Sequence, residues 1–263
     1  MSRPPAALLV AAVVVCAGCP RRGSDAAATV ARVEYARRSF RSSLAGCADP
    51  ASGVSTACVQ IDIDYVELTR ASAPLVEAVA AFLAATALRP VADAAPAESV
   101  EDLRDDLYER YRARQREVPG YRTPWVVERT ITVACNTDRV QALTAVLRAS
   151  AGDGDASERI EYRTFDNLTG EAVRLDDVVV AELRADFEDA VRVRLDTAGT
   201  GEVGRGSLFE RAPTSARGVG WVDPEAILVC PETITVQWRD DGATTTVELP
   251  RDAVQAFLRS DAP

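Results

Sequence analysis

The sequence predicts an α+β domain that follows an N-terminal export signal. Two observations predict the fold class: runs with strand periodicity occur in neighbouring pairs joined by turn residues, and helical patterns are grouped apart from those pairs. We therefore expect one or more antiparallel sheets with helices packed on one side. A third observation, four cysteines in the chain after residue 19, indicates two disulfides in an exported protein.

Residues 1–18 have the composition of a secretory signal peptide. Arg3 supplies the charged start, and the apolar run that follows is shorter than the roughly 20 residues that a membrane-spanning helix needs. Ala17 and Gly18 lead into Cys19 as in a bacterial lipobox, although Cys16 occupies a position that is usually aliphatic. We expect Cys19 to become the lipidated N-terminus. An ordinary cleaved signal peptide with a soluble product is the alternative.

Residues 19–45 are predicted to form the lipidated N-terminus and a flexible tether, because they lack sustained apolar periodicity. A short helix within residues 29–39 is an alternative for part of this segment. The domain is expected over residues 46–263, with two subregions, 46–150 and 151–263. The export signal and the lipidated Cys19 predict an extracytoplasmic location, on the outer membrane or facing the periplasm. The acyl chains would hold the protein there, because each buried CH₂ contributes about 0.8 kcal/mol of membrane binding.

The first predicted strand carries two acidic side chains on one face. Apolar and polar residues alternate over residues 59–65, which indicates a half-buried strand with Asp62 and Asp64 facing outward. The two carboxylates are candidates for a cation site, but a solvated face is the commoner role of such a pair. We expect the apolar side chains to face the core, and these are Val59, Ile61, Ile63 and Tyr65.

Two helices are predicted after this strand. The first covers residues 73–88 and ends before Pro90, and the second is highly charged, has Ser99 as its N-cap and extends to about residue 117. Because the apolar stripe of the second helix is thin, we expect most of that helix to be exposed. The stripe consists of Leu103, Leu107 and Tyr111.

The rest of the chain contains two predicted hairpins and two more helices. Turn residues at 136–138 and 240–242 mark the hairpins. Asp177 is expected to cap a helix that extends to about residue 195, and the Gly-, Ser- and Thr-rich residues 197–217 indicate a loop. The strands are predicted at residues 125–135, 139–150, 158–166, 225–230, 233–239 and 244–249, with a terminal helix from residue 250.

The cysteines of the domain are Cys47, Cys58, Cys135 and Cys230. Three pairings are possible, and sequence cannot choose among them. We favour Cys47–Cys58, which closes a short loop, and Cys135–Cys230, which joins two distant strands. A metal site is not expected, because no two of these cysteines have the close spacing of a zinc motif.

Composition excludes several classes of function. The formal net charge of −10 argues against nucleic acid as a partner and is compatible with a cationic protein partner. The chain contains neither His nor Lys, so Ser-His-Asp triads, Cys-His pairs and Schiff-base lysines are ruled out within it. We predict no catalytic residue, no metal and no cofactor.

Residues 162–178 resemble the signature of a family of bacterial extracellular domains. Members occur as the ectodomain of anti-sigma-V-type factors, as an accessory region of peptidoglycan deacetylase C and in many envelope lipoproteins of unknown role. The resemblance extends over about residues 57–259, but residues 150–157 lack the His that many members carry before the signature. The matching positions are Phe165, Asp166, Thr169, Gly170, Leu175 and Asp176.

The signature is expected to have a structural role. We predict that Thr169 and Gly170 turn the chain, that Leu175 enters the core, and that Asp176 or Asp177 caps the following helix.

The predicted function is that of a non-catalytic envelope lipoprotein with a binding or sensing domain. Its partner would be a cationic envelope protein, such as a hydrolase of lysozyme type, or peptidoglycan itself. One alternative is a carboxylate-based enzyme acting on cell-wall glycan, with Asp166, Asp176 and Asp177 among its candidates. The other is an outer-membrane assembly factor that docks through the Arg-rich helix at residues 99–117.

Overall fold

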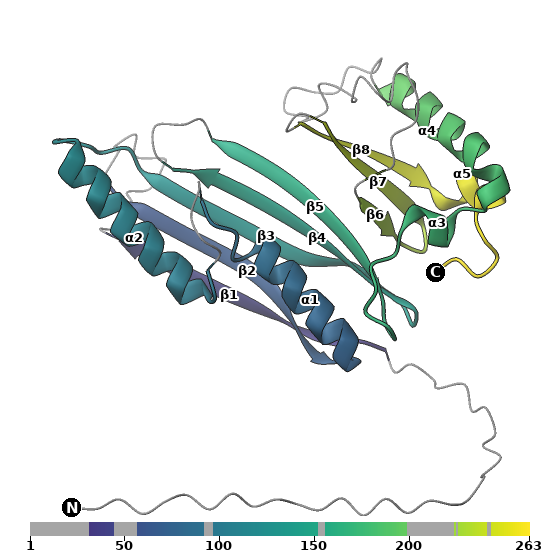
Figure 1. The fold of residues 1–263 in the computed structure, drawn as a ribbon, viewed down its shortest axis with the longest axis horizontal. Coiled ribbons are helices and arrows are strands. Elements are labelled where there is room, and N and C mark those ends of the chain that lie inside the picture. The colour runs from purple at the N-terminus through teal and green to yellow at the C-terminus, as the bar shows by residue number, and fades with distance from the viewer. Residues whose placement is uncertain are drawn as a thin grey trace, which may run out of the picture.

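A computed structural model describes residues 32–44, 57–91, 97–151, 156–198, 224, 226–240 and 243–263. The predicted signal peptide, Cys19, Cys47 and most of the loop at 197–217 lie outside the described residues. The described chain forms two sheets, each with helices on one face (Figure 1). The strands are β1 Glu34–Leu44, β2 Val59–Arg70, β3 Trp125–Asn136, β4 Val140–Ser150, β5 Ser157–Asp166, β6 Ala226–Val229, β7 Thr233–Asp240 and β8 Ala243–Pro250.

The first sheet has the order β1-β2-β3-β4-β5 and is not wholly antiparallel. The predicted hairpin of β3 and β4 is confirmed, but β2 and β3 run parallel. The physical reason is the long connection between them, which contains the helices α1 (Ala73–Thr86) and α2 (Val100–Glu117) and returns the chain to the end where β2 began. The sheet is therefore mixed, with three antiparallel pairs and one parallel pair.

The prediction of a tether up to residue 45 is wrong from residue 34 onward. Residues 34–44 form β1, an edge strand that pairs antiparallel with β2 and places Phe40 opposite Ile63. The alternative of a short helix is wrong for residues 34–39 for the same reason. One face of β1 is exposed and the other is mostly half-buried, but the half-buried face mixes Phe40 and Leu44 with polar side chains such as Ser42, so the sequence lacks a clear apolar alternation.

Helices α1 and α2 cover one face of this sheet and bury its apolar side chains (Figure 1). Val59, Ile61 and Ile63 of β2 are fully buried as predicted, whereas Tyr65 is half-buried and Val66 is buried in its place. The Ser99 hydroxyl accepts a hydrogen bond of 3.0 Å from the Asp102 amide, which confirms the predicted cap. The predicted stripe of α2 is buried at Leu103, Leu107 and Tyr111.

The second sheet has the order β6-β7-β8 and is antiparallel throughout. Its apolar face packs on α4 (Arg184–Ala198) and α5 (Arg251–Val254), with Phe187 and Val191 of α4 completely buried. The helix predicted from Asp177 to about residue 195 is interrupted. It consists of a single turn, α3 (Leu175–Val178), a 3₁₀ turn, η2 (Ala181–Leu183), and then α4.

The interruption follows from a run of three valines at residues 178–180. Val179 and Val180 have extended backbones, and they pair with the chain after α5, where the Val180 amide donates to the Phe257 carbonyl at 2.9 Å. Branched side chains favour this extended state over a helix. The terminal helix is also shorter than predicted, because α5 passes into a 3₁₀ turn, η4 (Gln255–Phe257).

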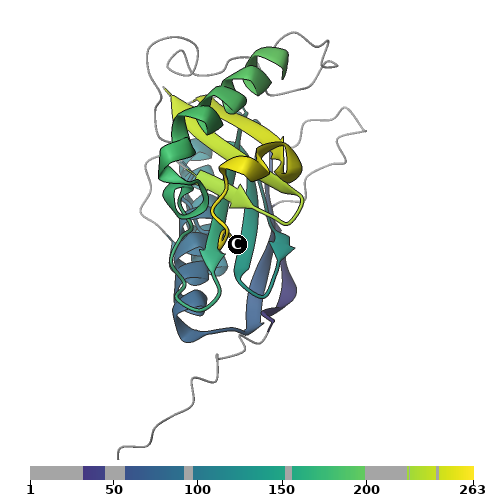
Figure 2. The same ribbon diagram turned by 90° about the vertical axis from the view of Figure 1, so that its right-hand side faces the viewer.

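The second sheet lies against β5, on the side away from α1 (Figure 2). Phe165 points toward α1, where its ring meets Phe82 edge-on at 6.2 Å. Its neighbour Thr164 therefore points the other way, and its hydroxyl donates to the Ile227 carbonyl and accepts from the Val229 amide, both at 3.0 Å. The Cys135–Cys230 disulfide joins the same two sheets.

The predicted pairing of Cys135 with Cys230 is confirmed. The sequence predicts two disulfides for the whole domain, and among the described residues this is the one with both of its cysteines present. Cys58 is also disulfide-bonded, but Cys47 lies outside the described residues, so the Cys47–Cys58 pairing stays a prediction.

Candidate functional site

The family-like signature forms a turn at the end of β5. The Asp166 carboxylate accepts hydrogen bonds from the amides of Leu168 and Thr169, at 2.9 and 2.8 Å. The Gly170 amide donates to the Asp166 carbonyl at 2.9 Å, and Gly170 has a φ of +70°. Thr169 and Gly170 thus reverse the chain as predicted, in a conformation that favours glycine.

The turn is packed against the N-terminus of α1. A Cβ at Gly170 would lie 2.4 Å from the Pro74 carbonyl oxygen, closer than any side chain could approach. The Ser72 hydroxyl donates to the Asn167 carbonyl at 2.6 Å, and the Asn167 amide group donates to the Thr137 carbonyl at 2.8 Å. The signature turn therefore ties α1 to the β3–β4 hairpin.

The signature also links the two hydrophobic cores. Phe165 is buried in the core under α1, and Leu175 is buried in the core of the second sheet. The capping carboxylate is that of Asp177, which accepts from the Arg174 amide at 2.8 Å, whereas Asp176 is largely exposed and pairs with Arg184. The contacts of these residues are architectural, and the signature itself does not form the candidate site.

The candidate site lies on the face of the first sheet opposite α1 and α2. The second sheet covers part of this face at β4 and β5, around Thr164, and we call the remainder the open face. The alternation along β3 identifies this face, because Ile131 and its partners on the helix side are buried while Thr130 and Thr132 are exposed. Asp62 and Asp64 of β2 lie on the same face, as the sequence predicted. Away from the second sheet, this face presents its side chains on a rigid backbone.

Strand register brings five charged side chains into one line across this face. Each stands directly opposite the next on the neighbouring strand, from β1 through to β5. We call this line the charged row, and it consists of Arg41, Asp62, Glu128, Arg148 and Glu158.

Ion pairs hold both ends of the charged row. Arg41 contacts Asp62 at 3.0 Å and Asp64 at 2.7 Å, and Arg148 contacts Glu158 at 2.8 Å. Hydrogen bonds from Arg41 and then from Ser39 lower the pKa of Asp64 below its usual value. Asp64 is therefore charged at neutral pH, and Arg41 holds its carboxylate in place.

The surface charge of the open face is acidic. Four carboxylates, those of the row and that of Asp64, share the face with the two guanidinium groups of the row and with Arg37, which alternates with Ser39 and Arg41 along β1. Asp64 retains 43% of its side-chain exposure and Arg148 retains 57%, so a partner can reach both. The face can thus act as an anionic contact surface.

The structure does not support a cation site at Asp62 and Asp64. Both carboxylates are already bound by Arg41, and Gln60 donates a further hydrogen bond to Asp62 at 2.7 Å. Across the described residues, no cluster of three or more His, Cys, Asp or Glu side chains is arranged to hold a metal ion.

Sequence reasoning found only the two aspartates of this face. Arg41 falls within the predicted tether, and in the sequence Glu128, Arg148 and Glu158 resemble the other polar positions of their strands. Alternation places these residues on the polar side of each strand, but the register that aligns them comes from pairing across the sheet.

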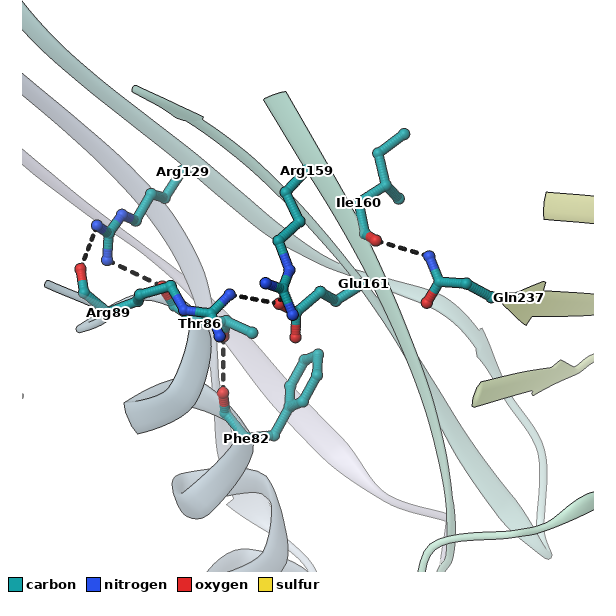
Figure 3. A network of polar contacts seen from close by, with 8 residues as sticks. All are labelled: Phe82, Thr86, Arg89, Arg129, Arg159, Ile160, Glu161 and Gln237. Atoms are coloured by element: carbon teal, nitrogen blue, oxygen red, sulfur yellow. Dashed lines mark hydrogen bonds and ion pairs between the residues drawn. The ribbon is translucent and has the colours of Figure 1, made fainter. Parts of the chain in front are cut away.

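The buried polar network on the helix side has a structural role (Figure 3). Arg129 of β3 is 4% exposed and donates to the carbonyls of Thr86, Ala87 and Arg89 at the end of α1. Burial lowers the pKa of Arg129 to about 10, so the side chain remains protonated at neutral pH. Arg89 in turn contacts Glu161 of β5 at 2.8 Å, which closes the network.

Helix α2 presents its charged side chains to solvent beside β1. Its first turn holds Glu101 and Asp102, and its last turn holds Arg114 and Arg116, which suits the helix dipole at both ends. The Tyr108 hydroxyl meets the Ser42 hydroxyl at 2.7 Å and joins α2 to the edge strand. No helix in the described part of the chain is both long and apolar enough to cross a bilayer.

Fold and site together define an α+β domain of two packed sheets with an open, acidic sheet face. No protein-family model matches the chain, and no curated protein matches it. The fold is shared with solved structures of the DUF3298 family. A member from Pseudomonas aeruginosa PAO1 has a TM-score of 0.55 and 10% identity, with 88% of this chain and 97% of that chain covered.

A second similar structure is a DUF3298 family member from Bacteroides fragilis NCTC 9343. It has a TM-score of 0.52 and 13% identity, and the match covers 87% of this chain and 94% of that one. At these identities the similarity shows a common fold alone. It places the chain beside domains of uncharacterised function.

Proposed function

We propose that the protein is a non-catalytic envelope lipoprotein whose domain binds a cationic protein through the open face of the first sheet. The observation that carries the proposal is the charged row, in which carboxylates outnumber arginines on a rigid sheet face that α1 and α2 do not cover. The net charge of −10 for the whole chain acts in the same direction, because it attracts a basic partner over a longer range.

The proposed partner is a basic hydrolase of lysozyme type, with peptidoglycan as the second candidate. Lipidation at Cys19 would hold the domain at a membrane outside the cytoplasm, and a Cys47–Cys58 disulfide would fit that compartment. A relation to the ectodomain of anti-sigma-V-type factors and to the accessory region of peptidoglycan deacetylase C belongs to this proposal. It is supported by the signature residues that shape the turn at Gly170.

The contacts of the candidate carboxylates favour binding over catalysis. A glycosidase needs a carboxylic acid whose pKa is raised, facing a second carboxylate across a cleft. Among the described carboxylates, those with a resolved shift are Asp64, Asp105 and Asp261, and the pKa of each is lowered. Asp166 and Asp177 accept backbone amides and serve as turn and cap residues.

The proposal is tested with the full chain carrying Cys19→Ser. Binding to a lysozyme immobilised on a sensor surface should saturate at micromolar concentration and weaken as salt is raised. Asp62→Asn combined with Glu128→Gln should weaken binding about tenfold or more, because two carboxylates leave the centre of the face. The same variant should fold normally, since exposed ion pairs contribute about 1 kcal/mol or less.

The matched control is Glu101→Gln combined with Glu109→Gln. It removes the same charge from exposed positions on α2, on the opposite side of the sheet. If the control weakens binding as much as the variant of the charged row, attraction is a property of net charge and the open face is not the site. The absence of saturable binding would also count against a basic protein partner, and binding to purified peptidoglycan alone would favour the second candidate.

A further inference from the structure

A second surface feature is a cavity of about 410 Å³ beside the signature segment. It lies where residues 172–176 run between the edge of β5 and the start of α4, with β6 on the remaining side. Three arginines from three different elements line it, namely Arg163 of β5, Arg174 and Arg184. In an acidic chain, three arginines around one cavity make a local basic site.

The three arginines differ in how their charges are balanced. Arg184 is neutralised by Asp176 and by Glu188, the latter at 3.2 Å. Within the part of the chain that the structure describes, neither the Arg163 nor the Arg174 guanidinium has an ion pair. Asp176 is the only carboxylate among the described lining residues, and Arg184 already holds it.

Arg163 is the arginine for which the lack of an ion-pair partner matters most, because it is partly buried. Its side chain is half-buried, and a guanidinium that loses water needs acceptors in return. Arg129 shows how the fold meets that need elsewhere, with three carbonyl acceptors for one buried guanidinium. No comparable acceptors are found for Arg163 among the described residues, so its guanidinium is available to an anion from outside the chain.

The cavity is held in a fixed shape. The Val173 amide donates to the Thr164 carbonyl at 2.8 Å, so the segment that carries Arg174 is attached to the strand that carries Arg163. Asp177 fixes the backbone of Arg174 through a 2.8 Å hydrogen bond. Between the arginines the wall is apolar, and its members are Ala172, Val173, Leu175, Ala226 and Ile227.

From this geometry we propose that the cavity binds a small carboxylate with a short apolar group. Guanidinium groups bind carboxylates with paired hydrogen bonds, and the apolar wall offers a place for an aliphatic chain of a few carbons. The site is separate from the charged row. The charged row reaches β5 at Glu158 on the open face, whereas Arg163 lies opposite Leu143, which is buried in the core on the other face.

The probe is propionate, added to the isotope-labelled full chain with Cys19→Ser and followed by amide NMR shifts. Propionate should shift the signals of Val173 and Arg174 and saturate between about 0.1 and 10 mM, as suits so few atoms. Propionamide, which has the same shape without charge, should leave these signals unchanged. Inorganic phosphate should bind more weakly than propionate, because it cannot use the apolar wall.

Arg163→Gln and Arg174→Gln should each weaken propionate binding about tenfold or more, because each removes a charged hydrogen-bond donor. Arg37→Gln is the matched control, since it removes an exposed arginine of β1 and should leave binding unchanged. Arg174 is exposed, so its variant tests the proposal even if the Arg163 variant fails to fold. Equal loss in the control, no saturation with propionate, or tighter binding of phosphate would overturn the proposal.

Discussion

Gly170 shows how a single residue ties the signature to the fold. Replacing it with Ala places a methyl group 2.4 Å from the Pro74 carbonyl oxygen and strains a backbone with φ of +70°. We expect the free energy of unfolding to fall by about 2–4 kcal/mol, because the clash with α1 adds to a strain of about 1 kcal/mol. Urea denaturation of the Gly170→Ala variant measures this loss.

Gly120 supplies the control for this prediction. It also has a positive φ, of +83°, but a Cβ there would meet nothing within 4 Å. Gly120→Ala should therefore cost only the backbone strain, about 1 kcal/mol. Similar losses in the two variants would mean that the approach of α1 to the turn does not matter.

The contact between Asp64 and Arg41 of the charged row predicts an effect of pH on stability. Arg41 and Ser39 lower the pKa of Asp64 in the folded protein, so the stabilising contribution of this carboxylate is present above the ordinary value of about 4 and is lost as pH falls through the lowered pKa. Arg41→Gln should raise the pKa of Asp64 toward that ordinary value. A carboxyl NMR titration measures the change, and Arg148→Gln, at the other end of the row, should leave Asp64 unaltered.

At the level of elements, the end of α1 depends on one buried arginine of β3. Arg129→Met keeps much of the side-chain volume but leaves the carbonyls of Thr86, Ala87 and Arg89 without their donor. We expect a loss of about 2–4 kcal/mol, because buried acceptors without a partner are costly. Thermal or urea unfolding tests this, and Arg89→Met, which breaks a more exposed ion pair, should cost about 1 kcal/mol or less.

The elements also show which sequence patterns were sufficient. β3 alternates clearly and turn residues join it to the apolar run of β4, so the hairpin could be predicted. β1 could not, because the half-buried face of this edge strand mixes apolar and polar side chains and so has no clear apolar periodicity. The valines at residues 178–180 fit a helical pattern by spacing, but pairing with the chain near Leu258 draws them into an extended conformation.

For the whole molecule, Cys135–Cys230 is the covalent link between the two sheets. The two cysteines are 95 residues apart, and closing a loop of this size restricts the unfolded chain by about 4–5 kcal/mol in the chain-entropy account. A variant with both cysteines changed to Ser should lose a large part of that stability. Amides of β6, β7 and β8 should then exchange with solvent faster than those of β2 and β3.

The second sheet should lose its protection from exchange first, because without the disulfide it is held to the first sheet partly by polar contacts. The contacts that join the second sheet to β5 include polar ones, such as those of Thr164 and of Gln237, which donates to Ile160 at 2.7 Å (Figure 3). Uniform loss of protection across both sheets would show that the two halves unfold as one unit. Hydrogen exchange with mass spectrometry distinguishes these outcomes.

The sequence by itself determined the α+β class, most of the strands, the cap at Ser99, the turn at Gly170 and the absence of His and Lys chemistry. These features depend on the conformational preferences of neighbouring residues and on amino-acid composition, and both can be read directly from the sequence. Only the tertiary structure decided the parallel pairing of β2 with β3, the charged row and the cavity between Arg163 and Arg174. Each of these brings together residues far apart in the chain, and strand register and the packing of one sheet on the other fix them.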